Sequence, residues 1–390
     1  MKILYVLDPA TIGGATKSFL GLLGEIMKRN VIPIVCLPEE SKFKDILKEM
    51  GISVIITGHR EMITYKYKGF HKAPLLNLRK RLSYLYHDYK ALSIVCNHLK
   101  NEHVDLIHTN SSRSDIGFFL SRKLQVPHIV HLREFGDLDY DCYPLNPFYI
   151  SIYNKYTTKF LSVSDAVKKH WVNKGICEEK VCTIYNGIDV SNLTISDEES
   201  KKAPQLHLLM SGGILFNKGH HLAIEAIGML PDDIKKNIFL TFIGWYDTYY
   251  KNYLDRVEAQ SKLPNRIKYL GANENVLREL GKYQIGLMCS RAEGFGRVTA
   301  EFMHAQLGVI ASDSGANPEL IEDRKTGILF RNGDVKSLSD AIYRFYMDRE
   351  LLIKCSNEAL RRARHLFTAK KNADEIYSIY REYARTCLTS

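Results

Sequence analysis

The sequence predicts an α/β protein of two doubly wound domains, each a mainly parallel sheet covered by helices on both faces. Short apolar runs alternate with longer amphipathic runs along almost the whole chain, as in parallel strands joined by crossover helices. The alternation stops at the polar stretch 191–205 and restarts with the apolar run 206–210. With 390 residues the chain is also too long for one typical core. We therefore expect a first domain over 1–190, a linker near 190–204 and a second domain over 205–368.

Each expected domain contains its own series of short apolar runs that we interpret as strands. Amphipathic segments between most of these runs are expected to be helices. Two such domains would face each other across a cleft, with ligands beyond the carboxyl ends of the strands. The expected strands are 3–7, 32–37, 54–56, 106–108, 129–131, 160–163 and 181–185 in the first domain, and 206–210, 239–243, 267–270, 285–288, 309–311 and 328–330 in the second.

The composition excludes several classes of protein. Hydrophobic residues make up 45% and charged residues 25% of the chain, as in ordinary globular proteins. The eight cysteines form no Cys-x-x-Cys pair, which favours a reducing compartment over a disulfide scaffold or a zinc site. The apolar run at the N-terminus is too short for a signal peptide, and no run approaches the roughly 20 apolar residues that span a bilayer. The sequence therefore predicts a soluble cytoplasmic protein.

The net charge of +10 is unevenly spread. Segment 60–90 holds eight Lys or Arg against only Glu61 and Asp88, with aromatic residues interleaved. Leucines at 75, 78, 82 and 85 recur at helical spacing, so part of the segment is expected to be an amphipathic basic helix. The segment is interpreted as a site for anionic lipid headgroups or an anionic acceptor, as a nucleic-acid site, or as a solvated face of a core-packed helix. No nucleic-acid motif accompanies it, so nucleic acid is not expected as a partner.

Two glutamates eight positions apart mark the most informative stretch of the second domain. Glu293 precedes, and Glu301 lies inside, a run from 297 to 305 that reads as a helix. Gly294 and Gly296 between them let backbone N–H groups approach a ligand closely. The start of the helix favours an anion such as a diphosphate, and the two acids can hold sugar hydroxyls. This arrangement suggests an enzyme that uses a nucleotide sugar.

Two strand-to-helix loops carry glycines that suit a phosphate. Gly13 and Gly14 follow the first expected strand, without the Gly-x-Gly-x-x-Gly dinucleotide fingerprint, so a turn that simply needs glycine is the other interpretation. In the second domain, the loop 211–219 ends in Lys218 and Gly219. A lysine at the mouth of such a unit is a natural partner for a diphosphate.

A histidine at a strand end, two aspartates and a pair of histidines are further candidates for chemistry. His131 ends an expected strand and could act as a hydrogen-bond donor or a general acid or base, or be structural. Asp137 and Asp139 lie in what reads as an irregular loop and are interpreted as solvated acids. The pair His220 and His221 has no third ligand at helical spacing. No metal site is predicted.

Taken together, these motifs resemble the retaining glycosyltransferases of family 4, the group 1 glycosyltransferases, which have the two-domain GT-B fold. Segment 290–303 is similar to the family's Glu-x7-Glu signature. Segments 309–319, 327–330, 184–189, 161–164 and 13–15 match the family in type and order. The resemblance covers nearly the whole chain and implies two Rossmann-like domains, an N-terminal one that binds the acceptor and a C-terminal one that binds the nucleotide sugar. It also implies that a last helix, 369–390, packs back on the N-terminal domain.

The resemblance assigns roles to individual residues. Glu301 would bind ribose hydroxyls, Glu293 hydroxyls of the transferred sugar, and Lys218 the diphosphate, while His131 would face the donor sugar. Glu293, His131 and Lys218 are thus the expected catalytic residues, in a reaction that retains configuration and needs no cofactor or metal. The implied donor-binding residues are Gly13, Gly14, Gly213, Lys218, Gly244, Gly271, Ala272, Glu293, Gly294, Phe295, Gly296, Arg297, Val298 and Glu301.

One position departs from the family. The family usually has an arginine where this chain has Gly213, and that arginine shares the charge of the diphosphate. Arg133, Arg291 and Arg297 are candidates to replace it, Arg297 first. An inactive member of the family is therefore one alternative, and a nucleotide-sugar epimerase or a non-enzymatic protein that binds anionic lipid or nucleic acid are others.

The sugar, the base and the acceptor stay open. The expected acceptor is a saccharide or a polyprenyl-diphosphate-linked saccharide in bacterial surface polysaccharide synthesis. Segment 60–90 would then associate with the anionic inner face of the cell membrane.

Overall fold

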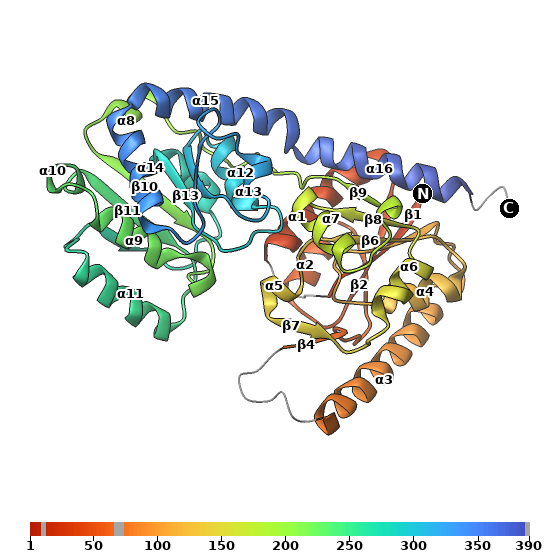
Figure 1. Ribbon diagram of the computed structural model, residues 1–390. Helices are drawn as coiled ribbons and strands as arrows, with labels where there is room; N and C mark the ends of the chain where they lie inside the picture. Colours follow the sequence, from red (N-terminus) through yellow and green to blue (C-terminus); the bar gives the residue numbers. More distant parts are fainter. Residues whose placement is uncertain (9–12, 66–73, 387–390) are drawn as a thin grey trace. The chain divides into compact units, whose positions relative to one another are not determined.

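The computed structural model describes residues 1–8, 13–65 and 74–386 and divides into two compact units. Unit 1 consists of residues Met1–Gly187 and Ala369–Ser390, and unit 2 of Ile188–Thr368. Each unit is built around its own parallel sheet, labelled in Figure 1. The fold is therefore α/β with two Rossmann-like sheets, which confirms the fold class that the sequence predicted.

The sheet of unit 1 has seven parallel strands in the order β3-β2-β1-β5-β6-β8-β9. Alternate residues of the strands point to opposite faces, and each face has its own apolar core. One core joins Tyr5 of β1 to α1, α2 and α16, and the other joins Val6 to α3 and α4. The strands are β1 (Lys2–Val6), β2 (Ile32–Leu37), β3 (Ser53–Ile56), β5 (Leu106–Thr109), β6 (His128–Leu132), β8 (Lys159–Ser162) and β9 (Val181–Thr183).

The helices of unit 1 are α1 (Gly14–Ile26), α2 (Lys42–Glu49), α3 (Pro74–His98), α4 (Ile116–Leu124), α5 (Asp137–Tyr140), α6 (Tyr149–Tyr156), α7 (Asp165–Asn173) and α16 (Ala369–Thr386). The last helix of the chain, α16, packs on α1 at the start of the chain, and the two lie together in Figure 1. Arg29 pairs with Asp374, and Asn372 donates a hydrogen bond to the carbonyl of Tyr185. These contacts place the chain's last described helix in unit 1.

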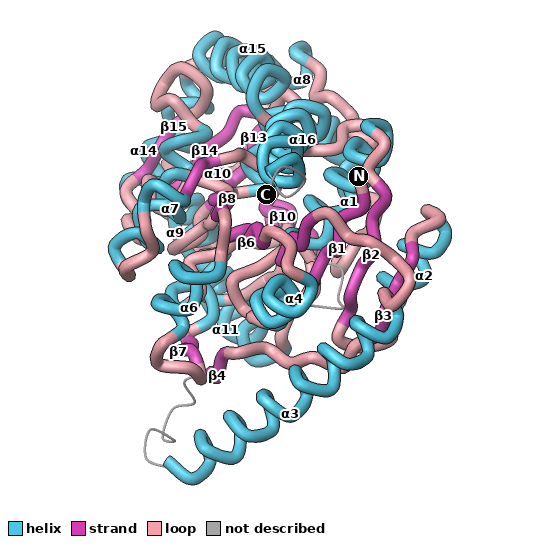
Figure 2. The backbone as a smooth tube through the Cα atoms, turned by 90° about the vertical axis from the view of Figure 1, so that its right-hand side faces the viewer, coloured by secondary structure: helices cyan, strands magenta, loops and turns pink. Residues whose placement is uncertain are grey.

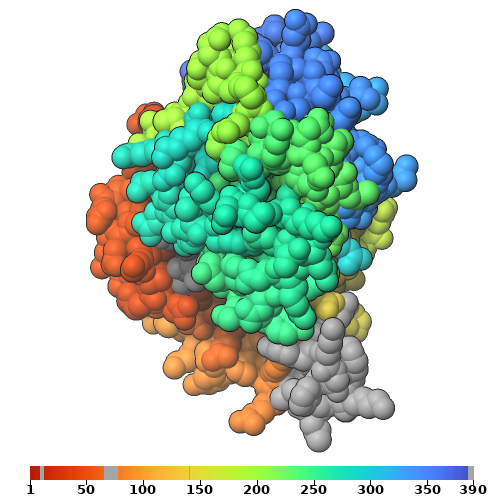
Figure 3. Space-filling model, turned by 90° about the vertical axis from the view of Figure 1, so that its left-hand side faces the viewer, coloured from red at the N-terminus to blue at the C-terminus, as the bar shows by residue number. Residues whose placement is uncertain are grey.

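The sheet of unit 2 has six parallel strands in the order β12-β11-β10-β13-β14-β15. Its helices are α8 (Glu198–Lys202), α9 (His220–Gly228), α10 (Asp232–Lys235), α11 (Thr248–Gln260), α12 (Arg297–His304), α13 (Asn317–Leu320), α14 (Val335–Met347) and α15 (Arg349–Leu366). Figure 3 views the unit from the side on which α11 forms much of the surface. The strands are β10 (Leu206–Ser211), β11 (Ile238–Ile243), β12 (Ile267–Tyr269), β13 (Ile285–Met288), β14 (Gly308–Ser312) and β15 (Ile328–Phe330).

The order of the strands reverses once in each sheet. In unit 1 the chain runs outward from β1 to β3 and then restarts with β5 on the other side of β1. In unit 2 it runs outward from β10 to β12 and restarts with β13 on the other side of β10. A crevice for ligands lies beyond the carboxyl ends of the strands at such a switch point. The two places to look for a site are therefore the ends of β1 and β5, and the ends of β10 and β13.

All thirteen strands expected from the sequence overlap a strand of one of the two sheets. The sequence analysis missed a small antiparallel pair, β4 (Ile63–Tyr65) with β7 (Cys142–Pro144). The expected irregular loop at Asp137 is wrong in part, because α5 is a one-turn helix. Asp137 pairs there with Lys174 and His170, so it is an ion-paired acid and not a merely solvated one.

The polar stretch that the sequence suggested as a linker belongs to unit 2. Ser196 donates a hydrogen bond to the carbonyl of Tyr283, and α8 follows directly. The ammonium group of Lys201 is buried and donates to the carbonyls of Ser196 and Asp197, and burial lowers its pKa to about 8. The stretch is polar because its side chains satisfy backbone carbonyls of unit 2.

Candidate functional site

An ion pair joins the two strand ends at the switch point of unit 2. The Nζ atom of Lys218 lies 2.5 Å from Oε1 of Glu293. Lys218 ends the short 3-10 helix η3 (Phe216–Lys218) after β10, and Glu293 lies in the loop after β13. The sequence analysis expected both residues at a bound donor, and the structure brings them into direct contact.

Glycines allow the backbone to pass closely around this pair. Gly219 has a φ of +72°, and a Cβ there would lie 2.4 Å from the carbonyl oxygen of Cys289. Gly315 has a φ of +59°, and a Cβ there would lie 2.5 Å from the carbonyl oxygen of Glu293. That same carbonyl accepts a hydrogen bond from the N–H of Ala316. Glu293 is therefore held between the ends of β13 and β14, with its side chain left to meet Lys218.

Helix α12 begins at Arg297, directly after the glycine-rich loop, as expected. Gly296 is its N-cap with a φ of +78°, a conformation that glycine adopts without strain. Thr299 in the first turn donates to Asn317, which fixes the start of α12 against α13. Three more of the residues expected to bind the donor, Gly294, Phe295 and Val298, also lie at the start of α12. The N-terminal end of the helix dipole favours an anion near this loop.

The second glutamate of the motif is paired within its own helix. The Nε atom of Arg297 lies 2.8 Å from Oε1 of Glu301, one turn later. Both side chains are largely buried, so the pair is shielded from solvent. Arg297 was the first candidate to replace the family arginine, and its charge here is balanced by Glu301. Arg133, another candidate, donates to the side-chain oxygens of Asn110 and Asn186 in unit 1.

The remaining predicted donor residues lie at the ends of β10, β11 and β12. A Cβ on Gly244 would lie 1.7 Å from the carbonyl oxygen of Gly212, so only glycine fits. The N–H of Gly244 donates to the carbonyl of Gly271, with Ala272 following at the surface. Gly213 is covered by the indole of Trp245, which the sequence analysis did not single out.

In unit 1, Gly13 and Gly14 form the N-cap and the first residue of α1. Among the residues that the structure describes, no heavy atom beyond the neighbouring chain lies within 4 Å of a Cβ placed on either glycine. The N–H of Gly13 donates to the hydroxyl of Thr16, which caps the helix. Residues 9–12 of the same loop lie outside the described residues.

His131 lies at the end of β6, with its ring fully buried and stacked on that of His108 at 5.4 Å between centroids. Burial, with Arg133 nearby, lowers the pKa of His131 well below the ordinary value. Among the described residues, neither ring nitrogen has a hydrogen-bond partner. A neutral buried imidazole can donate or accept a hydrogen bond, but it does not take up a proton near pH 7. The geometry therefore favours hydrogen bonding over proton transfer at this residue.

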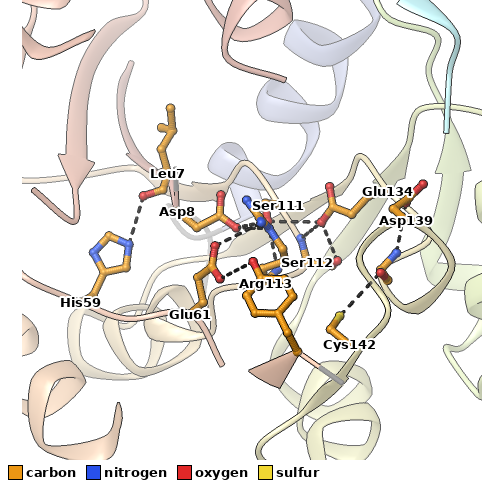
Figure 4. Close-up of polar contacts among 12 residues, drawn as sticks. Leu7, Asp8, His59, Glu61, Ser111, Ser112, Arg113, Glu134, Asp139 and Cys142 are labelled. Atoms are coloured by element: carbon orange, nitrogen blue, oxygen red, sulfur yellow. Dashed lines mark hydrogen bonds and ion pairs between the residues drawn. The ribbon is translucent and has the colours of Figure 1, made fainter. Parts of the chain in front are cut away.

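A polar cluster that the sequence analysis largely missed occupies the switch point of unit 1 (Figure 4). Asp8 follows β1, and its Oδ2 accepts hydrogen bonds from the hydroxyl of Ser111, at 2.5 Å, and from Nε of Arg113, at 2.9 Å. Arg113 also pairs with Glu61, at 3.1 Å. The other carboxylate oxygen of Asp8 is buried and has no hydrogen-bond partner among the described residues. Nothing in the sequence alone connected Asp8 with Ser111.

Glu134 joins the cluster from the end of β6. Its Oε1 accepts from the N–H of Ser112 at 2.9 Å, from the Ser112 hydroxyl at 2.7 Å and from the Ser111 hydroxyl at 3.2 Å. The indole N–H of Trp171 donates to the backbone carbonyl of Glu134 and fixes the loop. Asp8 and Glu61 thus pair with the guanidinium of Arg113, and Glu134 is linked to Asp8 through the hydroxyl of Ser111.

Among the residues that the structure describes, acids outnumber cations in this cluster. Burial raises the pKa of Glu134 and of Glu61, and the charge of Arg113 only partly offsets it. Such a group of carboxylates gains from a ligand that brings O–H or N–H donors. Polar residues directly after β1, β5 and β6 were the signal in the sequence, and the strand order was needed to show that they meet.

Two further properties of the described residues bear on metal ions and membranes. They include no group of three or more His, Cys, Asp or Glu side chains that could hold a metal ion. No described helix is both long and apolar enough to cross a bilayer.

Comparisons with known proteins agree with this architecture. A family model of group 1 glycosyl transferases matches residues 192–362, and a model of glycosyltransferase family 4 matches residues 12–192. The chain is 26% identical over 309 residues to the uncharacterized glycosyltransferase MJ1178 of Methanocaldococcus jannaschii, which is 78% of this chain and 82% of that protein. It is 29% identical to the lipopolysaccharide core biosynthesis mannosyltransferase LpcC of Rhizobium leguminosarum, over 45% of this chain and 51% of that protein.

Solved structures show the same fold. The crystal structure of Anabaena Alr3699/HepE in complex with UDP matches with a TM-score of 0.78 and 20% identity, over 98% of this chain and 100% of that one. A glycosyltransferase from Rickettsia africae matches with a TM-score of 0.77 and 18% identity, over 98% of both chains.

Proposed function

The chain belongs to the group 1 glycosyltransferases of family 4, with the GT-B fold, and on this premise we propose a specific reaction for it. The protein transfers a sugar from a nucleotide-diphosphate sugar to a saccharide or lipid-linked saccharide, with retention of configuration. The observation that carries the proposal is the ion pair between Lys218 and Glu293 at the switch point of unit 2, beside the start of α12.

The pair suggests how a donor is recognised. A diphosphate carries more charge than one carboxylate and would draw the ammonium group of Lys218 away from Glu293. Glu293 would then be able to accept hydrogen bonds from hydroxyls of the sugar. Binding of the donor would thus replace the ion pair with two new contacts, Lys218 with the diphosphate and Glu293 with the sugar. Crystal structures of HepE in complex with UDP and with UDP-glucose support a nucleotide sugar as the donor class.

The chemistry requires a stabilised leaving group. The bond between the anomeric carbon and the phosphate oxygen breaks, and the electron pair stays on the diphosphate. Lys218 and the N-terminal end of α12 would stabilise that charge. The departing phosphate oxygen takes the proton of the acceptor hydroxyl, whose oxygen bonds to the anomeric carbon on the same face. No residue of the chain is then needed as a nucleophile.

We place the acceptor in unit 1, at the ends of β1 and β5. The carboxylates of Asp8 and Glu134 are positioned to accept hydrogen bonds from sugar hydroxyls. This assignment is supported by the switch point in the strand order and by the surplus of acids over Arg113.

We further propose that α3 binds the surface of the membrane that contains the lipid-linked acceptor. The helix packs on unit 1 through Tyr84, Ala91 and Val95. A second apolar stripe faces outward, with Leu82 60% exposed and Tyr89 71% exposed. Figures 1 and 2 show that the N-terminal half of α3 extends past the sheet, and Figure 3 shows its side chains at the surface in orange. The stripe consists of Leu78, Leu82, Leu85, Tyr86 and Tyr89, with exposed Arg79, Arg81 and Lys90 beside it.

An outward apolar stripe flanked by cations fits a bilayer with anionic lipids. Residues 66–73 of the basic segment lie outside the described residues. The relatives named for lipopolysaccharide core and capsular polysaccharide synthesis support an acceptor in bacterial surface polysaccharide assembly.

Calorimetry tests the donor proposal. UDP, GDP and dTDP are titrated into the wild type, Glu301→Ala and Glu301→Gln, with Glu274→Ala as a control on an exposed acid of the same unit. One nucleotide should bind the wild type, and its Kd should rise about 10-fold or more in Glu301→Ala, because a charged hydrogen bond is lost. Glu301→Gln should lose less affinity for the nucleotide, since the glutamine side chain keeps an oxygen that can accept a hydrogen bond from Arg297. If no nucleotide binds the wild type, the proposal is wrong.

Vesicle sedimentation tests the membrane proposal separately. The wild type should bind vesicles that contain phosphatidylglycerol and not vesicles of phosphatidylcholine alone. Leu82→Glu should abolish that binding, while Leu138→Glu, a change at an equally exposed leucine on α5, should not. Equal binding of the two variants would contradict a role for α3.

A further inference from the structure

Trp245 stands out because it is the exposed member of the chain's two tryptophans. Its side chain is 57% exposed, whereas Trp171 is buried and donates a hydrogen bond to the carbonyl of Glu134. Tryptophan is mostly buried in folded proteins, so an indole left open at a strand end calls for an explanation. Trp245 lies directly after β11, among the strand ends that form the candidate donor site of unit 2.

The backbone around Trp245 is fixed on both sides. The N–H of Ile214 donates to the carbonyl of Trp245 at 2.8 Å, and Ile214 pairs with Tyr246 in a β-bridge. Before it, Gly244 passes so close to the carbonyl of Gly212 that no side chain fits. The loops after β10 and β11 are therefore joined, and the indole has a defined place on the loop that leads to Lys218.

The ring itself rests on Gly213. A Cβ placed on Gly213 would lie 3.2 Å from Nε1 of Trp245 and 3.3 Å from its Cε2. The edge of the indole that carries Nε1 thus lies over the glycine, while the residue as a whole is 57% exposed. The absence of a side chain at position 213 is what makes room for the indole.

We propose that Trp245 forms a wall of the nucleoside subsite, with its exposed ring face stacking on the base of the donor. This inference rests on the proposed function, which places the diphosphate at Lys218 and the sugar at Glu293, on the β13 side of the switch point. The nucleoside then extends to the ends of β11 and β12, where Trp245 and Gly271 lie. A flat aromatic ring with one N–H donor suits a nucleobase, because every base offers a π face.

The test separates the nucleoside from the diphosphate. Calorimetry is carried out on the wild type, Trp245→Ala and Trp245→Phe. The two ligands are inorganic pyrophosphate and the nucleoside diphosphate that binds the wild type. Tyr343→Ala, at an exposed aromatic residue on α14, is the control. Trp245→Ala should raise the Kd of the nucleotide about 10-fold or more and leave that of pyrophosphate unchanged, because only stacking is lost. Trp245→Phe should retain most of the affinity.

Fluorescence of the wild-type protein gives a second readout that needs no variant. Acrylamide reaches Trp245 and not the buried Trp171, so the quenchable signal comes from Trp245. Saturating nucleotide should protect that signal. The inference is overturned if nucleotide binds the wild type by calorimetry while the quenching is unchanged, or if Trp245→Ala binds as the wild type does. If no nucleotide binds the wild type, the proposed function fails, and this inference fails with it.

Discussion

Nζ of Lys218 lies 2.5 Å from Oε1 of Glu293, although 75 residues separate them in the chain. The contact exists because β10 and β13 are neighbours in the sheet while β11 and β12 lie on the other side of β10. Both side chains are partly exposed, so the pair contributes little to stability and is easily opened. A pair of this kind is suited to exchange partners when a charged ligand arrives.

The first prediction concerns the leaving group. Lys218→Ala should lower kcat/KM for the nucleotide sugar by about 100-fold or more, because a cation that stabilises developing charge is removed. The melting temperature should stay within about 2 °C, since the side chain is partly exposed. Initial rates and thermal unfolding measure the two effects. Lys282→Ala, an exposed lysine of the same unit, is the control, and equal rates for both variants would refute the role of Lys218.

The second prediction uses two glycines of α1. In the part of the chain that the structure describes, no heavy atom beyond the neighbouring chain lies within 4 Å of a Cβ placed on Gly14 or Gly24, so alanine should fit at both in the unliganded protein. Gly24→Ala should raise the free energy of unfolding by roughly 0.5–1 kcal/mol, because alanine favours the helix, and leave the rate unchanged. Gly14→Ala should fold equally well but raise the KM of the donor about 10-fold if a phosphate approaches the backbone there. An unchanged KM for Gly14→Ala would exclude that approach.

The third prediction concerns the backbone that positions Lys218. Gly219 has a φ of +72° and faces the carbonyl of Cys289, so Gly219→Ala introduces both strain and a clash. We expect the free energy of unfolding to fall by about 1–3 kcal/mol. Urea denaturation measures this change. Gly333→Ala is a matched control, since Gly333 has a φ of +76° but no described neighbour within 4 Å of a Cβ. Gly333→Ala should lower the free energy of unfolding by less than Gly219→Ala does. Equal losses would show that the close approach to Cys289 has no effect.

The fourth prediction concerns the buried carboxyl pair that anchors α3. Asp88 on α3 and Asp115 before α4 are neighbouring buried carboxyl groups, and Tyr84 donates to Asp115. Burial, together with the neighbouring acid, raises the pKa of Asp88. The folded state therefore holds a proton that the unfolded state releases above its ordinary carboxyl pKa of about 3.9. The free energy of unfolding contributed by this pair should fall as the pH rises from 5 to 9.

Asp88→Asn should remove this pH dependence of the free energy of unfolding. Asparagine keeps an acceptor for the N–H of Arg60 and supplies a permanent donor to Asp115. The variant should therefore be more stable than the wild type at pH 9, with the difference shrinking towards pH 5. Urea denaturation across that range measures it, with Asp45→Asn, at an exposed acid on α2, as control. Parallel curves for the wild type and Asp88→Asn would show that the pair shares no proton.

Much of the fold could be read from the sequence because strand and helix patterns are local. The apolar run at 285–288, the glycines at 294 and 296 and the start of α12 at Arg297 each follow from neighbouring residues. The last helix, by contrast, was expected from the resemblance to the family, and α16 occupies that part of the chain. The small pair of β4 with β7 was missed, because its strands are three residues each and lie far apart in the chain.

The sequence by itself determined which residues stand at strand ends, and so it named Lys218 and Glu293 as candidates. Only the tertiary structure decided which of them meet. The order of strands in a sheet places Lys218 on Glu293, Asp8 on Ser111 and Arg113, and the indole of Trp245 on Gly213. Burial likewise lowers the pKa of His131 well below its ordinary value, whereas the pair of Arg297 with Glu301 follows from their spacing of one turn in α12. Most of these contacts join segments far apart in the chain, and local patterns contain no information about such neighbours.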